Sequence, residues 1–308
     1  MVTVLSLALF LLPLRNTQEG VRTMARPLRI EFSGALYHII SRGIGKMTIF
    51  HKDADWKKFI DTLDKVIHRC NWICHAYCLM GNHYHLLVET PDPNLSRGMK
   101  HLNQIYSQYY NWKYHRVGPV LQGRYKAYLV EKEARFLDNS RYIVNNPAKA
   151  KLVEHPSDWP WSSYRSTVGT AKCPSYLETA FLLGHFSSSR KKARKMYEDF
   201  VLAGINSESP LKEAKNQIFL GSDSFVQEVM KHAKESDEIK NVPREQKFAG
   251  RPVLDKIFDL KTLHSKKTRN TKIQHAYLNY GYTLREIADH LNLNPNYLSF
   301  MLGKMKKI

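Results

Sequence analysis

Two apolar segments joined by a two-residue turn place the strongest constraint on this chain. Residues 72–80 and 83–89 are rich in Cys, Tyr, Leu and Val, and Gly81-Asn82 separates them. A Gly/Asn turn between two such segments predicts a β-hairpin. The chain must therefore contain an antiparallel sheet, at least one face of which packs against a hydrophobic core.

The segments around the hairpin add strands and helices in alternation. We predict strands over 35–42 and 125–131 and helices over 53–70, 95–115 and 132–146. The resulting order is β-α-β-β-α-β-α. Its first six elements match a ferredoxin-like α+β arrangement, an antiparallel sheet with two helices on one face. The other face is then open for chemistry, and the seventh element, a helix, can lie near it.

The charge balance points to an acidic partner. The chain has 47 Lys and Arg against 28 Asp and Glu, a formal net charge of +19. A nucleic acid backbone is the commonest counterpart of such an excess, and nothing in the sequence favours a membrane instead. Four cysteines are too few for a disulfide framework, so we expect a cytoplasmic, nucleoid-associated protein. Cys74, His75 and Cys78 suggest zinc, but no second ligand pair follows at suitable spacing.

The second strand of the hairpin carries a pair of histidines. His83 and His85 are two residues apart, so their side chains project from the same face of the strand. Tyr84, Leu86 and Val88 form the opposite, apolar face. Two imidazoles on one rigid strand suit a divalent cation. A chain with 14 histidines can contain such a triplet by chance, but its place directly after a tight turn favours a functional site.

The helix predicted over 132–146 has an aromatic residue on its polar side. At about 100° per residue, Phe136 and Ile143 lie on the apolar side, whereas Tyr142 and Asn146 are neighbours one turn apart on the other. This spacing fits a phenol that points into a site, with an amide oxygen beside it. The alternative is a partly buried structural tyrosine, because the chain has 17 tyrosines.

From Met24 to about Arg165 the chain resembles the REP-associated tyrosine transposases, which are HUH single-tyrosine enzymes. The matching segments are ALYHIISRG, LMGNHYHLLVET, NLSRGMKHLNQIYSQYYN, VLQGRYKAYLVE, SRYIVNNPAKAKLV and DWPWSSYRS. Without the family's Tyr-x-x-x-Asn-Pro pattern, four other tyrosines would be rival nucleophiles: Tyr106, Tyr109, Tyr110 and Tyr114. The family's nucleophile matches Tyr142. The family's metal ligands match His83, His85 and Asn146.

This resemblance implies a metal-dependent enzyme that cleaves and rejoins DNA strands. The metal, Mg²⁺ or Mn²⁺, would polarise the scissile phosphate. Tyr142 would attack it and leave a 5′-phosphotyrosine link and a free 3′-hydroxyl, so that rejoining needs no ATP. The implied substrate is single-stranded DNA that contains hairpins. Three basic residues are candidate DNA contacts, with ordinary solvated charge as the alternative: Arg42, Arg124 and Lys126.

We expect four regions along the chain. Residues 1–23 lack the basic start and the cleavage site of a signal peptide, so we interpret them as an extension or a misassigned start before Met24. A secreted basic nuclease is the alternative. Residues 24–166 are expected to form the catalytic domain, and 167–250 a helical extension and linker, with helices near 188–204, 209–218 and 223–235. Residues 251–308 are expected to bind DNA.

Residues 283–307 predict a helix-turn-helix. Thr283 and Glu286 form a capping box, Asn292-Leu293 turns the chain, and Asn294-Pro295 starts a second helix. A simple helical hairpin that packs on the catalytic domain is the alternative. The residues that the second helix would present to a major groove are Asn296, Tyr297, Ser299 and Lys304.

Three hypotheses for function follow from the sequence. The first is the transposase-type nuclease and strand transferase. The second is a non-catalytic nucleic-acid-binding regulator, in which the histidine pair and Tyr142 are dispensable. The third is a domesticated enzyme that cleaves DNA but mobilises nothing. The sequence predicts neither the target sequence nor the oligomeric state.

Overall fold

The computed structural model describes residues 29–234, 248–259 and 265–305. The expectation for residues 1–23 therefore lies outside the described residues. No helix within the described ranges is both long and apolar enough to cross a bilayer.

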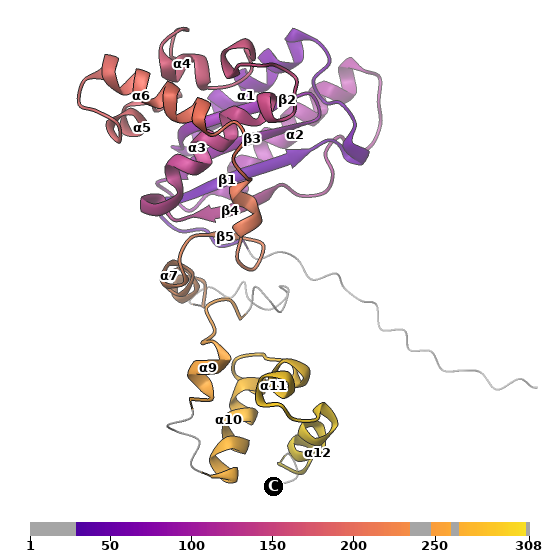
Figure 1. The fold of residues 1–308 in the computed structure, drawn as a ribbon. Helices are drawn as coiled ribbons and strands as arrows, with labels where there is room; N and C mark the ends of the chain where they lie inside the picture. The colour runs from indigo at the N-terminus through magenta and orange to yellow at the C-terminus, as the bar shows by residue number, and fades with distance from the viewer. Residues whose placement is uncertain (1–28, 235–247, 260–264, 306–308) are drawn as a thin grey trace, which may run out of the picture.

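A five-stranded mixed sheet forms the centre of the larger part of the molecule (Figure 1). Its strand order is β2-β3-β1-β4-β5, in which the first four strands pair antiparallel and β5 pairs parallel with β4. The predicted hairpin is confirmed, with Gly81 and Asn82 as its turn. The strands are β1 (Ala35–Arg42), β2 (Ile73–Met80), β3 (His83–Thr90), β4 (Lys126–Val130) and β5 (Phe219–Leu220).

Helices α1 (Asp53–Cys70) and α2 (Leu95–Lys113) pack side by side on one sheet face. Both carry apolar residues at helical spacing. These residues are buried together with the strand residues that face the two helices. Phe59 of α1, for example, contacts the ring of Tyr84 on β3, with ring centroids 4.6 Å apart. The helix over 53–70 is confirmed with these bounds, and α2 ends two residues before the predicted end.

The second sheet face is covered, so the expectation of an open face is wrong. Phe136, Ile143 and Val144 are buried in one cluster with Ala76 and Leu87 of the sheet. This burial removes apolar surface from water and therefore favours a covered face over an open one. The helices on this side are α3 (Lys132–Lys149), α4 (Tyr164–Val168), α5 (Ala180–Gly184) and α6 (Arg190–Ala203).

The segment after α6 departs most from the sequence prediction. Of the helix predicted over 209–218, only a short 3-10 turn (η3, Pro210–Glu213) forms. The chain then adds β5 to the sheet edge, where Leu129 N donates to Ile218 O at 2.7 Å. A two-residue strand has no alternation to read, so the sequence did not reveal it. Two further 3-10 turns are η1 (Ile44–Lys46) and η2 (Pro156–Asp158).

The C-terminal helices have a core of their own. Ile273, Ile287 and Leu298 are among its buried residues. The predicted capping box is confirmed, because Glu286 N donates to Thr283 Oγ1 at 3.0 Å and Thr283 N donates to Glu286 Oε2 at 2.6 Å. The helices that share this core are α9 (Leu254–Ile257), α10 (Lys266–Leu278), α11 (Leu284–Leu291) and α12 (Pro295–Met305). Helix α7 (Asp223–Lys234) buries its apolar residues in the same core as α1 and α2.

Candidate active site

Two strands and one helix bring an aromatic and imidazole cluster together on the α3 side of the sheet. Tyr142 of α3 lies with its ring centroid 5.9 Å from that of His85 on β3 and 5.9 Å from that of His38 on β1. The rings of His83 and His85 are 5.1 Å apart. The helix that covers this sheet face therefore brings the phenol next to the histidine pair.

A chain of hydrogen bonds fixes the tautomer of His85. Asn139 Nδ2 donates to the carbonyl of Arg135, which leaves Oδ1 to accept the proton on His38 Nδ1 at 2.9 Å. His38 Nε2 is then unprotonated in the neutral ring and accepts from His85 Nδ1 at 2.9 Å. The lone pair of His85 is consequently on Nε2, the nitrogen that remains for a ligand.

His83 is oriented in the same way by a second asparagine. Asn82 Nδ2 donates to the carbonyl of Lys46 at 3.1 Å, and Asn82 Oδ1 accepts from His83 Nδ1 at 2.6 Å. This bond leaves the Nε2 lone pair of His83 available as well. Each histidine of the pair thus has a partner that fixes its tautomer, as is usual for metal-binding imidazoles.

The three histidines are held in their neutral form. Burial lowers the pKa of His38 to about 4, and burial together with the charge of Arg42 lowers the pKa of His83 to about 4. Burial, followed by the neighbouring His38, His83 and Arg42, lowers the pKa of His85 well below its ordinary value. Neutral imidazoles have a free lone pair at physiological pH, which is the form that binds a cation.

Pro147 accounts for the orientation of Asn146. Because proline lacks an N–H, it cannot donate to the carbonyl of Ile143 one turn earlier. Asn146 Nδ2 approaches that carbonyl at 3.3 Å and also donates to the carbonyl of Tyr142 at 2.8 Å. With Nδ2 committed to the helix backbone, the amide oxygen is the atom left for a cation. The substitute bonds also explain why α3 continues to Lys149, past the predicted end of the helix.

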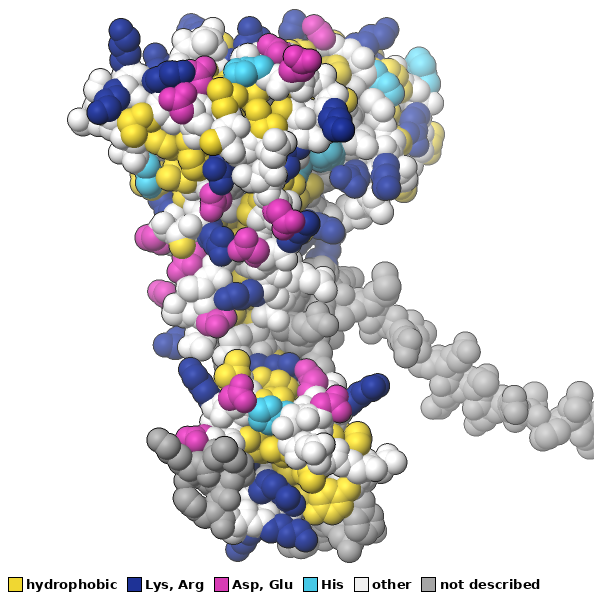
Figure 2. All heavy atoms as spheres, viewed as in Figure 1, with side chains coloured by type: hydrophobic (Ala, Val, Ile, Leu, Met, Phe, Trp, Pro, Cys, Tyr) yellow, Lys and Arg dark blue, Asp and Glu magenta, His cyan; other side chains and the backbone are white. Residues whose placement is uncertain are grey.

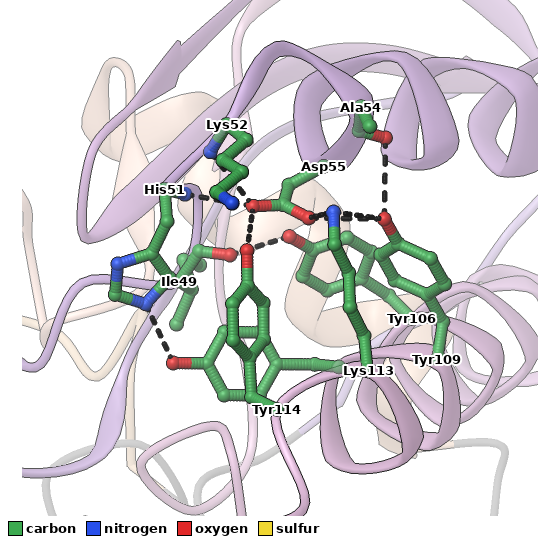
Figure 3. A network of polar contacts seen from close by, with 10 residues as sticks. Ile49, His51, Lys52, Ala54, Asp55, Tyr106, Tyr109, Lys113 and Tyr114 are labelled. Carbon is green, nitrogen blue, oxygen red and sulfur yellow. Dashed lines mark hydrogen bonds and ion pairs between the residues drawn. The ribbon is translucent and has the colours of Figure 1, made fainter.

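The four rival tyrosines all donate to acceptors on the other side of the sheet. Asp55 accepts from Tyr114 at 2.6 Å and from Tyr109 at 3.0 Å, as Figure 3 shows. Tyr106 and Tyr110 donate to the carbonyls of residues 49 and 48. In the described part of the chain, by contrast, the hydroxyl of half-buried Tyr142 has no hydrogen bond. Among these five tyrosines it alone has a hydroxyl that is not engaged in holding helices together.

Sequence reasoning missed three residues around Tyr142. His38 and Asn139 fix the tautomer of His85, and Lys149 places its Nζ 5.2 Å from the centroid of the Tyr142 ring. His38 had a usable signal, because it is a polar residue on the otherwise apolar centre of a strand. Asn139 and Lys149 had none, since polar residues on a helix are ordinarily solvated.

The candidate DNA contacts lie in separate places. Arg42 pairs with His83 across β1 and β3 and is exposed at the site, whereas Arg124 and Lys126 are exposed at the start of β4. On the face in Figure 2, Lys and Arg side chains are spread over the sheet-containing part with Asp and Glu among them. On α12 the side chain of Lys304 lies outside the described residues, and the exposed candidates are Asn296, Tyr297 and Ser299.

The donor set fits a hard divalent ion that takes nitrogen and oxygen ligands. Two neutral imidazoles and one amide oxygen suit Mg²⁺ or Mn²⁺ less than carboxylates do, but they leave positions for phosphate oxygens and water. Within the described ranges no three His, Cys, Asp or Glu side chains are grouped to hold a metal, so the third ligand would have to be the Asn146 amide.

A zinc site on β2 is excluded by geometry. A bulge between Cys74 and Ala76 changes which face the strand presents, so Cys74 lies in the core under α1 and α2 and Cys78 in the core under α3. Their thiols therefore point to opposite sides of the sheet. Burial also raises the pKa of Cys74 to about 12, which disfavours the thiolate that zinc requires.

Parts of this chain resemble known proteins. A protein of Haemophilus influenzae described as a REP-associated tyrosine transposase is 27% identical over 104 residues, which cover 30% of this chain and 59% of that relative's length. A solved structure of a REP-associated tyrosine transposase bound to a REP hairpin aligns with a TM-score of 0.43 and 16% identity, over 50% of this chain and 98% of that one. The family model for IS200-like transposases matches residues 31–146, the segment that contains β1 to β4, the histidine pair and Tyr142.

Proposed function

We propose that this protein is a metal-dependent DNA endonuclease and strand transferase of the transposase type, with Tyr142 as the nucleophile. The observation that carries the proposal is the meeting of an unbonded phenol with two oriented, neutral imidazoles from a different element. The match of residues 31–146 to the family model for IS200-like transposases supports it independently.

The cleavage step transfers a phosphoryl group to the protein. The Tyr142 hydroxyl oxygen attacks the scissile phosphorus, its proton passes to solvent, and the bond from phosphorus to the 3′ oxygen breaks. The products are a 5′-phosphotyrosine and a DNA end whose 3′ oxygen takes up a proton. Attack by another 3′-hydroxyl on the same phosphorus reverses the step and releases Tyr142, so the energy of the phosphodiester is conserved.

A divalent ion bound by His83, His85 and Asn146 would supply Lewis-acid polarisation of the phosphate. The residues of the chain do the positioning. Burial of the imidazoles, the bond of His83 to Asn82 and the bond of His85 to His38 keep both Nε2 lone pairs available. Lys149 places its ammonium 5.2 Å from the centroid of the Tyr142 ring.

We propose single-stranded DNA with hairpins as the substrate. The relative and the solved structure that resemble this chain are REP-associated transposases, and that structure holds a REP hairpin. Arg42 borders the histidine pair and is the nearest of the candidate DNA contacts to the site. The formal charge of +19 supports a polyanionic partner.

The finer organisation belongs to the same proposal. The order of β1 to β4 and the two helices on one face support a ferredoxin-like catalytic domain within residues 24–166. Residues 167–250 would be an extension that covers the other face, and 251–308 a duplex-binding region. Helices α11 and α12, the capping box and the exposed side chains of Asn296, Tyr297 and Ser299 support a helix-turn-helix there.

The test is covalent capture of DNA. The full chain is incubated with a library of single-stranded hairpin oligonucleotides and Mn²⁺, then denatured and separated by gel electrophoresis. We expect a DNA-protein band with Mn²⁺ and none with a chelator. Binding of the hairpins without any denaturation-resistant band, across the library, would favour the non-catalytic regulator. Hairpin repeats beside the gene are the first sequences to include.

A further inference from the structure

We propose that a pocket beside the open end of β4 binds one unpaired base of the DNA strand close to the scissile phosphate. This inference rests on the proposed function and adds a specificity site to it. The pocket has a volume of about 460 Å³, within the range of sites for small ligands. It is lined by residues 29–31, by β4 and the residues before it, and by the segment that leads into β5.

The walls suit the flat face of a base. Tyr125 and Tyr128 are half-buried in the lining, and Leu129 and Ile218 are buried behind them. The Tyr125 ring is held in place, because the guanidinium of Arg29 lies 4.4 Å from its centroid and its hydroxyl is 3.2 Å from Ser96 Oγ. A fixed aromatic ring is a stacking platform that every base can use.

The rim suits the phosphates on either side of that base. Arg29, Arg124 and Lys126 line the pocket and only one carboxylate does, that of Glu31. Glu31 Oε1 accepts from the backbone N–H of Ser96 at 2.8 Å, at the start of α2, so this carboxylate is engaged in capping a helix. The excess of positive charge around an aromatic lining favours a nucleotide strand over a neutral apolar ligand.

The strand edge beside the pocket is unpaired in the described part of the chain. β5 pairs with Leu129 and Val130 and with no earlier residue of β4. Leu129 N donates toward β5, and strand geometry points the N–H of Ala127 to the same edge, where no strand follows. A backbone donor at this point can bond to the edge of a base, which gives selectivity as well as stacking.

The pocket borders the active site through one shared residue. Tyr128 lines the pocket and pairs with His38 across β4 and β1, with ring centroids 6.2 Å apart. From β3, which carries the histidine pair, to β4 is two strand spacings, about 10 Å. An unpaired DNA strand covers such a distance in a few nucleotides, so the base in the pocket would be within a few positions of the cleaved bond.

Abasic scanning tests this directly. A hairpin oligonucleotide captured in the covalent assay is made as a series in which each unpaired nucleotide in turn lacks its base. Fluorescence anisotropy then measures the Kd of each for the full chain. We expect one position near the cleavage site at which loss of the base weakens binding by about tenfold or more. A uniform profile across all unpaired positions would overturn the proposal.

Two variants show whether the sensitive position is the one in the pocket. Tyr125→Leu removes the stacking ring, and Ala214→Phe fills the pocket from a residue with ordinary backbone angles (φ −64°, ψ 112°). In both we expect weaker binding of the intact oligonucleotide and no further loss at the sensitive abasic position. Trp112→Leu is the matched control, because Trp112 is 77% exposed on α2 and outside the pocket lining.

The outcomes separate this inference from the proposed function. If the wild-type chain forms the covalent adduct but both pocket variants keep the full abasic penalty, the base binds elsewhere and the pocket proposal fails while the nuclease stands. If no adduct forms, the proposed function fails. The abasic series is then made from the hairpin of the library that the full chain binds most tightly, and its anisotropy profile still reports whether the pocket holds a base. Circular dichroism of each variant confirms that a loss of binding does not come from unfolding.

Discussion

The two sides of the sheet both gather tyrosines and polar groups, but their hydrogen bonding differs. On the α1–α2 side, Asp55 accepts bonds from Lys113 at 2.5 Å, from Tyr114 at 2.6 Å and from the backbone N–H groups of His51 and Lys52 at 2.9 Å each (Figure 3). On the α3 side the supporting residues are bonded while the hydroxyl of Tyr142 has no bond in the described residues. The first network holds two helices together, whereas the second leaves one hydroxyl without an internal partner, the group that we propose reacts with the substrate.

The difference suggests a criterion that separates structural tyrosines from the proposed nucleophile. Residue type and count do not distinguish them, since several tyrosines lie on α2 and only one of the candidates on α3. What distinguishes them is whether the hydroxyl is satisfied inside the protein. The following experiments test this contrast, beginning with the largest expected effect.

Removal of the hydroxyl of Tyr142 should abolish the covalent adduct. Tyr142→Phe leaves the ring and its packing, so we expect an unchanged melting temperature and a loss of adduct formation of about 10⁴-fold or more. Tyr114→Phe is the matched control on the other side and should keep the adduct while it lowers stability. An adduct that persists in Tyr142→Phe would break the contrast between the two sides.

Loss of the charge at Asp55 should affect stability and leave the chemistry alone. Asp55→Asn removes the buried carboxylate that pairs with Lys113 and so leaves the ammonium group without its counter-ion. We expect the free energy of unfolding to fall by about 3 kcal/mol. Urea denaturation measures this. Adduct formation at a temperature well below the midpoint should match that of the wild type, and a selective loss of the adduct would place Asp55 in the reaction.

Asp55 also predicts how stability depends on pH. Burial opposes its ionisation, but the bonds from Lys113, Tyr114 and the two backbone N–H groups outweigh burial and hold the pKa of Asp55 well below its usual range. A carboxylate whose pKa is lowered on folding stabilises the protein fully above its unfolded pKa, about 3.9, and this contribution is lost as the pH falls below that value. The acid-induced loss should be smaller in Asp55→Asn, as followed by urea titrations from pH 6 to about pH 3.

The tautomer chain predicts an effect on metal binding that does not require DNA. Asn139→Ala removes the acceptor for His38 Nδ1, so His38 no longer has to keep Nε2 free for His85. We expect Mn²⁺ affinity to drop by about 10- to 100-fold, measured by isothermal titration calorimetry. Ser157→Ala serves as a control away from the site. Unchanged affinity in Asn139→Ala would show that the chain does not position His85.

The smallest effect is expected in the C-terminal helices. Thr283→Ala removes one half of the capping box of α11, and we expect a loss of about 1 kcal/mol in the stability of that region. Hydrogen exchange should show faster exchange in α11 and α12 with no change in β1 to β4. Faster exchange across the whole sheet would mean that the two parts unfold together.

The sequence predicted the strands, and the approach of Tyr142 to the histidine pair, better than it predicted which segments cover the second face of the sheet. Alternation along β1 and β3 gave their bounds to within one residue and put His83 and His85 on one face. It did not show that α3 continues past Pro147, because the substitute bonds from Asn146 are visible only in three dimensions. Nor did it show β5, whose place depends on a contact 90 residues along the chain from β4.

The supporting residues were harder to predict than the proposed metal ligands. Asn139 acts on His85 only through His38, so neither its spacing nor its chemistry marks it in the sequence, and His38 is marked only as a polar residue in the apolar centre of a strand. The proposed ligands, by contrast, follow local patterns of two and four residues. Residues that act directly tend to follow a local period, whereas those that orient them are selected by the tertiary fold.

Identification of the residue that carries the DNA distinguishes Tyr142 from the four other tyrosines. The covalent adduct formed with Mn²⁺ is digested with a protease and a nuclease, and the nucleotide-bearing peptide is sequenced by mass spectrometry. The account predicts a phosphodiester on Tyr142, in the peptide that contains YIVNNP. A nucleotide on Tyr106, Tyr109, Tyr110 or Tyr114 would contradict it.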